Sequence, residues 1–541
     1  MSNPQPATGA AGANPNLRRH ALVAVFGLIA VLPIWIPTFP AMCDAPQHAS
    51  QVVIYSQLKH PGFAYSQLFV VHMLTPNLAG YIPLLLLKPL VGVVAACKLV
   101  VSAALFGFLL ATSWLVTEFG GDPLLALLAV PGLYGFPFQW GFIGFLVAAP
   151  FGICFLVFAK RYFRHPSVRG GIGLGLFFLF VFFCHAMTAA YAAGLAAVYA
   201  LADMHSARQL LFRWLPIIVT VPTAGLWWVH SVARNPFTHR PMEWDLDWNR
   251  FSNIFLHITG WPGALLAFLF VVALIAPIVF LLGMRRQWRF YVLFACCMAN
   301  AIFTPRGVFG ADAVYERYAV FVLPCFALTL APINLVTRRR AKMAIGWLAI
   351  FALVWIAGVA WRMTVFEREA RGFSTLLRQM APGQRVLSIN FERNSKVFEG
   401  AVFLHFPVWY SALKFGLVDP SFACGNVDLV LYRREAMPKA RFADFEFHPE
   451  SFNWQEHEGW RYRYFVVHSP AEAGAKLFAS SEKPVILRAH EDDWWLYENM
   501  APLRSSIAQP DSPPCNNNRA GYPAHCGVEA IVAFRERLAS G

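Results

Sequence analysis

An aspartate and a histidine, Asp44 and His48, lie four residues apart in FPAMCDAPQHAS, directly after the first long apolar segment. A helix that begins near Pro46 would present both side chains on one face. A carboxylate in this setting could serve as a general base that accepts a proton from an attacking hydroxyl group. The alternative is a structural helix cap, because aspartate is common where a helix begins and proline is common in its first turn.

A second charged group lies far along the chain, in TPRGVFGADAVYERYAVF, which carries Arg306, Asp312, Glu316 and Arg317. An arginine side chain presents a planar fork of N–H donors that matches a phosphate group. Arg317, and secondarily Arg306, are therefore candidate phosphate ligands, with Glu316 beside them as a candidate substrate contact. The alternative is an ion pair between an arginine and one of the acids, which would lock the loop.

Residues in two other loops suit a sugar. Trp244 and Asp245 lie in the loop 231–258, and an aromatic ring beside a carboxylate can contact the face and the hydroxyl groups of a sugar. Tryptophan is also common at a membrane interface, which is the simpler explanation. Asn77, in TPNLAGY, is predicted near the outer mouth of a membrane span and is a further candidate substrate ligand.

The composition predicts a polytopic α-helical membrane protein. Hydrophobic residues make up 57% of the 541 residues and charged residues 14%, whereas soluble proteins have roughly 25% charged residues. Apolar runs of membrane length recur from Ala21 to Met363. Much of the basic charge behind the net charge of +14 lies in short loops between these runs. It therefore indicates membrane orientation, and no nucleic-acid partner is expected.

The basic residues also predict the topology. Arg18 and Arg19 place the N-terminus in the cytoplasm, so Asp44 is expected on the outer face of the membrane. Four short basic loops are predicted to lie inside, at 160–164, 208–213, 285–289 and 338–340. The apolar runs give about eleven spans. We place them near 21–39, 70–90, 93–117, 139–159, 171–187, 188–204, 212–230, 260–283, 288–304, 317–336 and 343–363.

One apolar segment, 123–138, is too short and too rich in proline and glycine for a span. A full span there would also move the basic residues from Lys160 to Arg169 to the outer face. We predict a re-entrant or half helix, which protein or a cavity must shield from lipid.

After Met363 the hydrophobic runs shorten and acids appear. VLSINF, YFVVHS, KPVILRA and WWLYEN are typical of short strands, and FSTLLRQM is typical of a helix. The first outer loop, 40–69, should contain one or two short amphipathic helices. The predicted division is a disordered cytoplasmic N-terminus at 1–17, a membrane region at 18–363, an extracytoplasmic α/β domain at 364–505 and an extended tail at 506–541.

Six of the ten cysteines fall in predicted spans, and Cys43, Cys424, Cys515 and Cys526 fall outside them. Cys515 and Cys526 flank a polar run with turn-forming residues in an oxidising space, so we predict a disulfide between them. The cysteine spacing matches no zinc finger, and the sequence has no P-loop and no ordered Rossmann fingerprint. Neither structural zinc nor direct use of a nucleotide is expected.

The layout of the whole chain resembles the GT-C superfamily of integral membrane glycosyltransferases. The shared features are a long first outer loop with an acid near its start, many spans and an outer C-terminal domain. Locally, CDAPQH at 43–48 looks like the D-x-P-x-H loop of uncharacterised bacterial members. TPNLAGY and the run HFPVWYSALKFG, which begins at His405, are similar to theirs. The chain departs from better-known members in lacking a paired acid at Asp44.

The resemblance implies a reaction and assigns residues to it. A hexosyl or pentosyl group would move, with inversion, from a polyprenyl-phosphate donor in the lipid bilayer to an extracytoplasmic glycan, lipid or protein. Asp44 would be the general base, and Arg317 and Arg306 would bind the departing phosphate. His405, in its matching run, would contact substrate. His48 could orient Asp44, bind the acceptor, or join Asp44 around a divalent cation.

Some members of the superfamily use such a cation, but two candidate ligands do not define a metal site, so no metal is predicted. A rival class is a transporter or flippase of lipid-linked envelope intermediates. The sequence shows neither the internal repeat nor the matching broken helices that many transporters have. A third class, an envelope scaffold without chemistry, would not need charges at Asp44 and Arg317.

Overall fold

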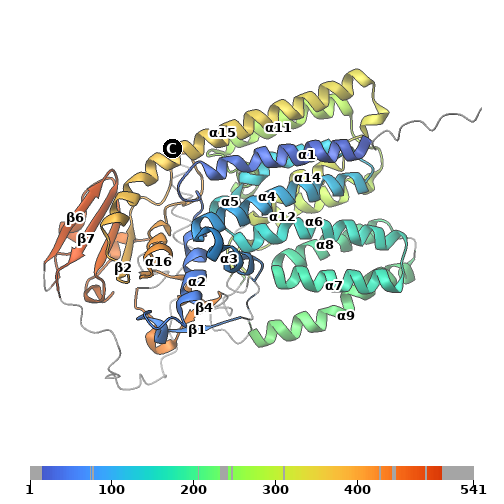
Figure 1. Ribbon diagram of the computed structural model, residues 1–541. Helices are drawn as coiled ribbons and strands as arrows, with labels where there is room; N and C mark the ends of the chain where they lie inside the picture. Colours follow the sequence, from blue (N-terminus) through green and yellow to red (C-terminus); the bar gives the residue numbers. More distant parts are fainter. Residues whose placement is uncertain are drawn as a thin grey trace, which may run out of the picture.

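The computed structural model describes residues 15–73, 75, 78–204, 206–231, 242–244, 248–308, 311–425, 428–440, 446–481 and 484–501. Long helices form a bundle, and a β-sheet lies beyond one end of it (Figure 1). We call residues 385–499 the sheet region. Short helices and loops lie between the bundle and the sheet region, and they carry the candidate site.

By length and composition, six helical segments in the described part of the chain could cross a membrane. They are Asn16–Trp35, which includes all of α1 (Pro15–Val31) except its first residue, then α4 (Val93–Glu118), α6 (Ile143–Arg164), the part of α9 (Ala207–Ser231) up to Trp227, α11 (Ala264–Leu282) and α15 (Arg338–Gln379). Four shorter apolar helices are α3 (Leu78–Val91), α7 (Val168–Cys184), α8 (Ala186–Ala202) and α12 (Val292–Phe303). Large apolar side chains such as Leu90, Leu226 and Phe280 are exposed, as expected of a multi-pass membrane protein in lipid.

Ten of the predicted spans overlap these helices, and the segment 317–336 differs. It contains only the end of α13 (Val314–Arg317), a 3-10 turn, α14 (Val322–Ala327) and a second 3-10 turn. Helix α14 ends at Ala327, and Pro332, which lacks the backbone N–H that a continuing helix needs, precedes the second 3-10 turn. The number of segments that cross the membrane therefore stays a prediction.

The apolar segment 123–138 forms a 3-10 helix, η3 (Pro123–Tyr134), which leads into α5 (Phe136–Trp140). Every residue of η3 is buried, and η3 packs against α1, α4 and α15. The Asp122 carboxylate accepts a hydrogen bond from the Leu124 N–H at 3.0 Å and so caps the first turn. Protein thus covers the segment on all sides, as a re-entrant segment would require.

Helix α15 connects the bundle to the sheet region without a break over 42 residues (Figure 1). The predicted span 343–363 and the predicted helix FSTLLRQM are both parts of it. At 1.5 Å per residue it is about 63 Å long, roughly twice the hydrocarbon thickness of a bilayer. Beyond that thickness, the Phe373 ring packs against Phe406 and Trp494, with centroids 5.2 Å and 5.3 Å away. The helix therefore ties the sheet region rigidly to the bundle.

The sheet has five strands in the order β3-β2-β5-β7-β6. They are β2 (Arg385–Asn390), β3 (Leu417–Asp419), β5 (Tyr464–His468), β6 (Val485–Glu491) and β7 (Trp494–Asn499). Strands β3, β2 and β5 are parallel, and β7 is antiparallel to β5 and β6. All residues of β2 and β5 are buried, because parallel strands are usually covered on both faces. Four of the five strands fall where the sequence predicted them.

The first outer loop forms α2 (Ala45–Gln57), which is buried over most of its length, although the sequence predicted amphipathic helices here. Two buried glutamines explain the difference, because they bond to backbone groups of the sheet region. The Gln47 amide donates to the Pro420 carbonyl at 2.9 Å, and the Gln51 carbonyl oxygen accepts from the Val430 N–H at 2.7 Å. The face of α2 that carries the apolar side chains and these amides is therefore a contact surface inside the protein.

A short strand from the same loop extends this contact. β1 (Phe69–Val71) pairs antiparallel with β4 (Val430–Tyr432). The rings of Phe69 and Tyr432 lie 4.6 Å apart. The start of α2 is thus held between the bundle and the sheet region.

Candidate active site

Main-chain hydrogen bonds set the position of Asp44. The Cys43 N–H donates to the Gln139 carbonyl at 2.8 Å, and the Asp44 N–H donates to the Trp140 carbonyl at 3.0 Å. Gly141 follows with a φ of +77°, and a Cβ at this position would lie 2.8 Å from the Asp44 nitrogen. Both the left-handed backbone and the close approach require glycine. The end of α5 therefore holds the start of α2 in place.

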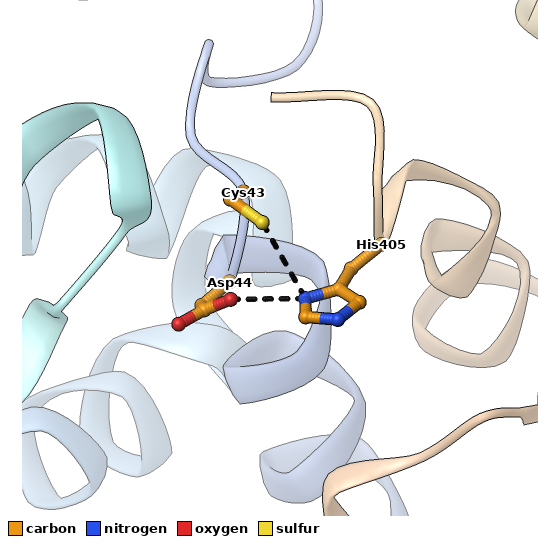
Figure 2. A group of neighbouring side chains, drawn as sticks. All are labelled: Cys43, Asp44 and His405. Carbon is orange, nitrogen blue, oxygen red and sulfur yellow. Dashed lines mark hydrogen bonds and ion pairs between the residues drawn. The ribbon is translucent and has the colours of Figure 1, made fainter. Parts of the chain in front are cut away.

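The Asp44 carboxylate points at a histidine of the sheet region (Figure 2). Its Oδ1 lies 2.9 Å from Nδ1 of His405, and Nε2 of His405 lies 2.6 Å from Oε1 of Glu446. All three side chains are buried. Asp44 occupies the N-cap position of α2, but its side chain makes no capping hydrogen bond there. A helix cap therefore does not describe its geometry.

His405 is held between two carboxylates. Burial alone lowers the pKa of His405, but its contacts with Cys43, Asp44 and Glu446 raise that pKa well above the usual range. An imidazolium at this position donates one N–H to Asp44 and the other to Glu446. The ring thereby orients the Asp44 carboxylate, which is one of the roles that the sequence left open for His48.

His48 lies one turn into α2 and belongs to a second buried chain of polar groups. Its Nδ1 lies 3.0 Å from the Tyr81 hydroxyl, which donates to Oδ1 of Asp428 at 2.7 Å. Burial lowers the pKa of His48 to about 4, so the ring is neutral near pH 7. A neutral His48 donates to Tyr81 from Nδ1 and keeps Nε2 as an acceptor.

We expect Asp428 to make stability fall as pH rises. Burial, the largest cause, raises the pKa of Asp428 from 3.8 to about 7. Between these values the folded protein binds a proton that the unfolded chain releases, so the free energy of unfolding decreases with pH. Asp428→Asn removes this titration and should reduce the decrease between pH 4 and pH 7 by more than about 1.4 kcal/mol, the value of a single pKa unit.

Unfolding of the purified protein across this pH range measures the effect, with Asp492→Asn, at an exposed aspartate, as the control. An unchanged pH dependence in Asp428→Asn would contradict the assignment.

Arg317 lies near Asp44, and backbone groups hold its guanidinium. Nε donates to the Ala313 carbonyl at 3.2 Å and Nη2 to the Asp312 carbonyl at 2.7 Å. The guanidinium carbon lies 3.8 Å from the centre of the Phe142 ring. Phe142 lies shortly after Trp140, whose carbonyl accepts the Asp44 N–H. The sequence left open an ion pair between Arg317 and the Asp312 side chain. In the structure Arg317 bonds instead to the main-chain carbonyl of Asp312.

Arg306 and Glu316, the other charged candidates of this segment, face each other. Arg306 Nε lies 3.9 Å from Oε1 of Glu316, and both side chains are buried. The Arg306 N–H donates to the Glu243 carbonyl at 2.8 Å, and Trp244, the next residue along the chain, is exposed. The sequence offered an arginine–acid ion pair that locks the loop as an alternative, and Arg306 and Glu316 form such a pair. Arg317 bonds to backbone carbonyls instead.

Sequence reasoning missed Arg250, in α10 (Asn249–Thr259). Its side chain is 1% exposed, and its guanidinium carbon lies 4.0 Å from the centre of the Tyr315 ring. Nη2 donates to the Thr304 carbonyl at 2.5 Å, while Nε and Nη1 have no hydrogen-bond partner among the described residues. A buried guanidinium of this kind is a further candidate for binding an anion. The only signal in the sequence was its place in the charged loop 231–258.

Four residues proposed from the sequence lie outside the described residues. They are Asn77 and Asp245, proposed as substrate ligands, and Cys515 and Cys526, proposed as a disulfide. These assignments stay predictions.

A multi-pass helical bundle with a buried aspartate held against a C-terminal sheet region defines the structural class. No family model and no curated protein matches the sequence. Solved structures with the same fold include two crystal structures of ArnT from Cupriavidus metallidurans. The apo structure has a TM-score of 0.52 at 12% identity, covering 89% of this chain and 97% of that chain. The structure bound to undecaprenyl phosphate has a TM-score of 0.53 at 12% identity, covering 91% and 99%. At this identity the likeness establishes the fold.

Proposed function

We propose that this protein is a GT-C-type glycosyltransferase that moves a sugar from a polyprenyl-phosphate donor to an acceptor outside the cytoplasm. The observation that carries the proposal is the buried Asp44 carboxylate, oriented by His405 and bound through its N–H to the segment on which the Arg317 guanidinium packs. A base beside a cation suits a displacement in which one oxygen loses a proton and another gains negative charge. The fold supports the lipid donor, because ArnT, which shares it, binds undecaprenyl phosphate.

In the proposed reaction an acceptor hydroxyl oxygen attacks the anomeric carbon of the sugar. Asp44 accepts the hydroxyl proton as the new carbon–oxygen bond forms. The bond between the anomeric carbon and the phosphate oxygen breaks on the opposite side, so the configuration inverts. The electron pair of that bond leaves with the polyprenyl phosphate, whose growing charge Arg317 stabilises.

The surrounding residues have supporting roles. His405 and Glu446 orient Asp44, and a second polar chain lies beside it, from His48 on α2 through Tyr81 on α3 to Asp428 in the sheet region. Arg306, compensated by Glu316, is the secondary phosphate ligand, and Arg250 is an additional candidate. Trp244, with Asn77 and Asp245, remains a proposed sugar or acceptor contact. The site and the sheet region are proposed to face the periplasm of a bacterium.

A transfer assay tests the proposal and separates it from the transporter alternative. Purified protein is mixed in detergent with a radiolabelled polyprenyl-phosphate sugar and a membrane extract that supplies acceptors. The transferase should convert the donor to free polyprenyl phosphate and a labelled product in equal amounts. A flippase would move intact donor across a vesicle membrane without breaking the sugar–phosphate bond, and this result would contradict the proposal.

A further inference from the structure

Two side-chain atoms, an oxygen and a sulfur, lie close to the same ring nitrogen of His405 (Figure 2). Nδ1 lies 2.9 Å from Oδ1 of Asp44 and 3.6 Å from Sγ of Cys43. An imidazole nitrogen carries at most one hydrogen, so it can donate a well-directed bond to only one of these atoms. An ion placed among the nitrogen, the oxygen and the sulfur would satisfy all three.

The three side chains are the one group of this kind in the described part of the chain. Their ligand atoms all lie within 4.8 Å of one another, and all three residues are buried. They come from two segments: Cys43 and Asp44 precede α2, and His405 belongs to the sheet region. Because the contact depends on the fold, the spacing of the residues in the sequence did not reveal it.

The distances suit tetrahedral coordination. A thiolate sulfur at 2.3 Å and an imidazole nitrogen at 2.0–2.1 Å from zinc are about 3.6 Å apart in that geometry, and the Cys43–His405 distance is 3.6 Å. A carboxylate oxygen and an imidazole nitrogen are about 3.3 Å apart in the same geometry. The Asp44–His405 distance of 2.9 Å would therefore need to lengthen by only a small amount.

The opposite nitrogen of the same ring has the partner that metal-bound histidines have. Nε2 of His405 lies 2.6 Å from the buried Glu446 carboxylate. Metal-ligating histidines commonly donate their other N–H to a carboxylate, which orients the ring and increases its basicity as a ligand. Glu446 supplies this contact and leaves Nδ1 directed at Asp44 and Cys43.

From these observations we infer that Cys43, Asp44 and His405 bind a zinc ion. Thiolate and imidazole ligands suit zinc, whereas Mg²⁺ and Ca²⁺ prefer ligand sets made only of oxygen. Three protein ligands leave a fourth position open, as in catalytic zinc sites. The ion takes the place of the proton on Nδ1 and binds Oδ1 of Asp44, while Oδ2 stays available to accept a proton.

The zinc site stands on its own geometry, and only its role in transfer rests on the proposed function. In that role the open position would take an oxygen of the donor phosphate, where the ion acts as a Lewis acid.

Metal titration of the full chain tests the inference. The protein is purified without a histidine tag, stripped with a chelator and titrated with Zn²⁺ and, separately, with Co²⁺. We expect tight binding of a single ion per chain, and a sulfur-to-metal charge-transfer band in the cobalt protein. Cys43→Ser should abolish the band and weaken zinc binding by more than about 100-fold, because loss of a partner that only supports a ligand typically costs 10–100-fold.

Two further variants complete the test. Glu446→Gln should weaken zinc binding by roughly 10–100-fold while the charge-transfer band remains. Cys424→Ser, at another buried cysteine of the sheet region, should change neither measurement. Zinc binding that is absent, or equal in the unmodified protein and in a folded Cys43→Ser variant, would overturn the inference. Sugar transfer by a protein that binds no zinc would overturn the inference alone, and zinc binding without transfer would overturn only the proposed function.

Discussion

Replacing Asp44 by asparagine should lower the transfer rate by roughly 10²–10⁴-fold, the usual contribution of a positioned general base. The amide keeps the size of the side chain, and its oxygen can still face Nδ1 of His405. It cannot accept the proton of the acceptor hydroxyl. The affinity for donor should fall less than the rate, because Arg317 and the membrane helices remain. Single-turnover transfer with saturating donor, together with a donor-binding measurement, gives the two quantities separately.

Asp122→Asn is the matched control for this experiment. Asp122 is also a buried aspartate at the start of a helix, where its carboxylate accepts a backbone hydrogen bond and pairs with Arg19. It lies at the other end of the first membrane helix from Asp44, so its replacement should leave transfer unchanged. If Asp44→Asn, with an unchanged unfolding temperature, transferred sugar at a near-normal rate, Asp44 would have only a structural role.

The membrane helices could be predicted because their signal is local. Apolar runs give most of the bundle, and the strands β2, β5, β6 and β7 follow from short β-branched and aromatic runs bounded by turn residues. The segment 317–336 is apolar like a span, but its helix α14 ends at Ala327, before Pro332, so its crossing of the membrane stays a prediction. The sequence divided α15 into a membrane span and a separate later helix, because the composition changes at Met363. The two form one continuous helix, since a change of composition does not require a break in the backbone.

The candidate site could be predicted only in part, because its contacts are not local. Asp44 and Arg317 were identifiable as charges in a poor setting for charge. The partner of Asp44, His405, lies 361 residues away, and Glu446 lies in a stretch with no periodic pattern. The burial of α2 was also unpredictable, since Gln47 and Gln51 look like a solvated face until the sheet region covers them. In each case the role of the residue depends on a segment that is distant in the sequence and adjacent in the fold.

Arg317→Lys should lower the transfer rate by roughly 10²–10³-fold, the usual cost of losing one donor to a developing negative charge. Lysine keeps the positive charge, but it cannot make both bonds to the Asp312 and Ala313 carbonyls and still present a flat guanidinium to phosphate. It also loses the stacking on Phe142. Because the phosphate is bound in the ground state as well, the affinity for donor should fall alongside the rate.

Arg306→Lys is the comparison that gives this result its meaning. Glu316 already balances the charge of Arg306 at 3.9 Å, so this variant should lose less than about 10-fold in rate, the equivalent of 1.4 kcal/mol in the barrier. The two substitutions remove the same chemical group from the same segment, and they differ in whether an acid compensates it. Transfer rates and donor affinities of both variants, measured beside their unfolding temperatures, decide the assignment. Equal losses in the two would place the phosphate between both arginines, whereas a loss confined to Arg306→Lys would contradict the role given to Arg317.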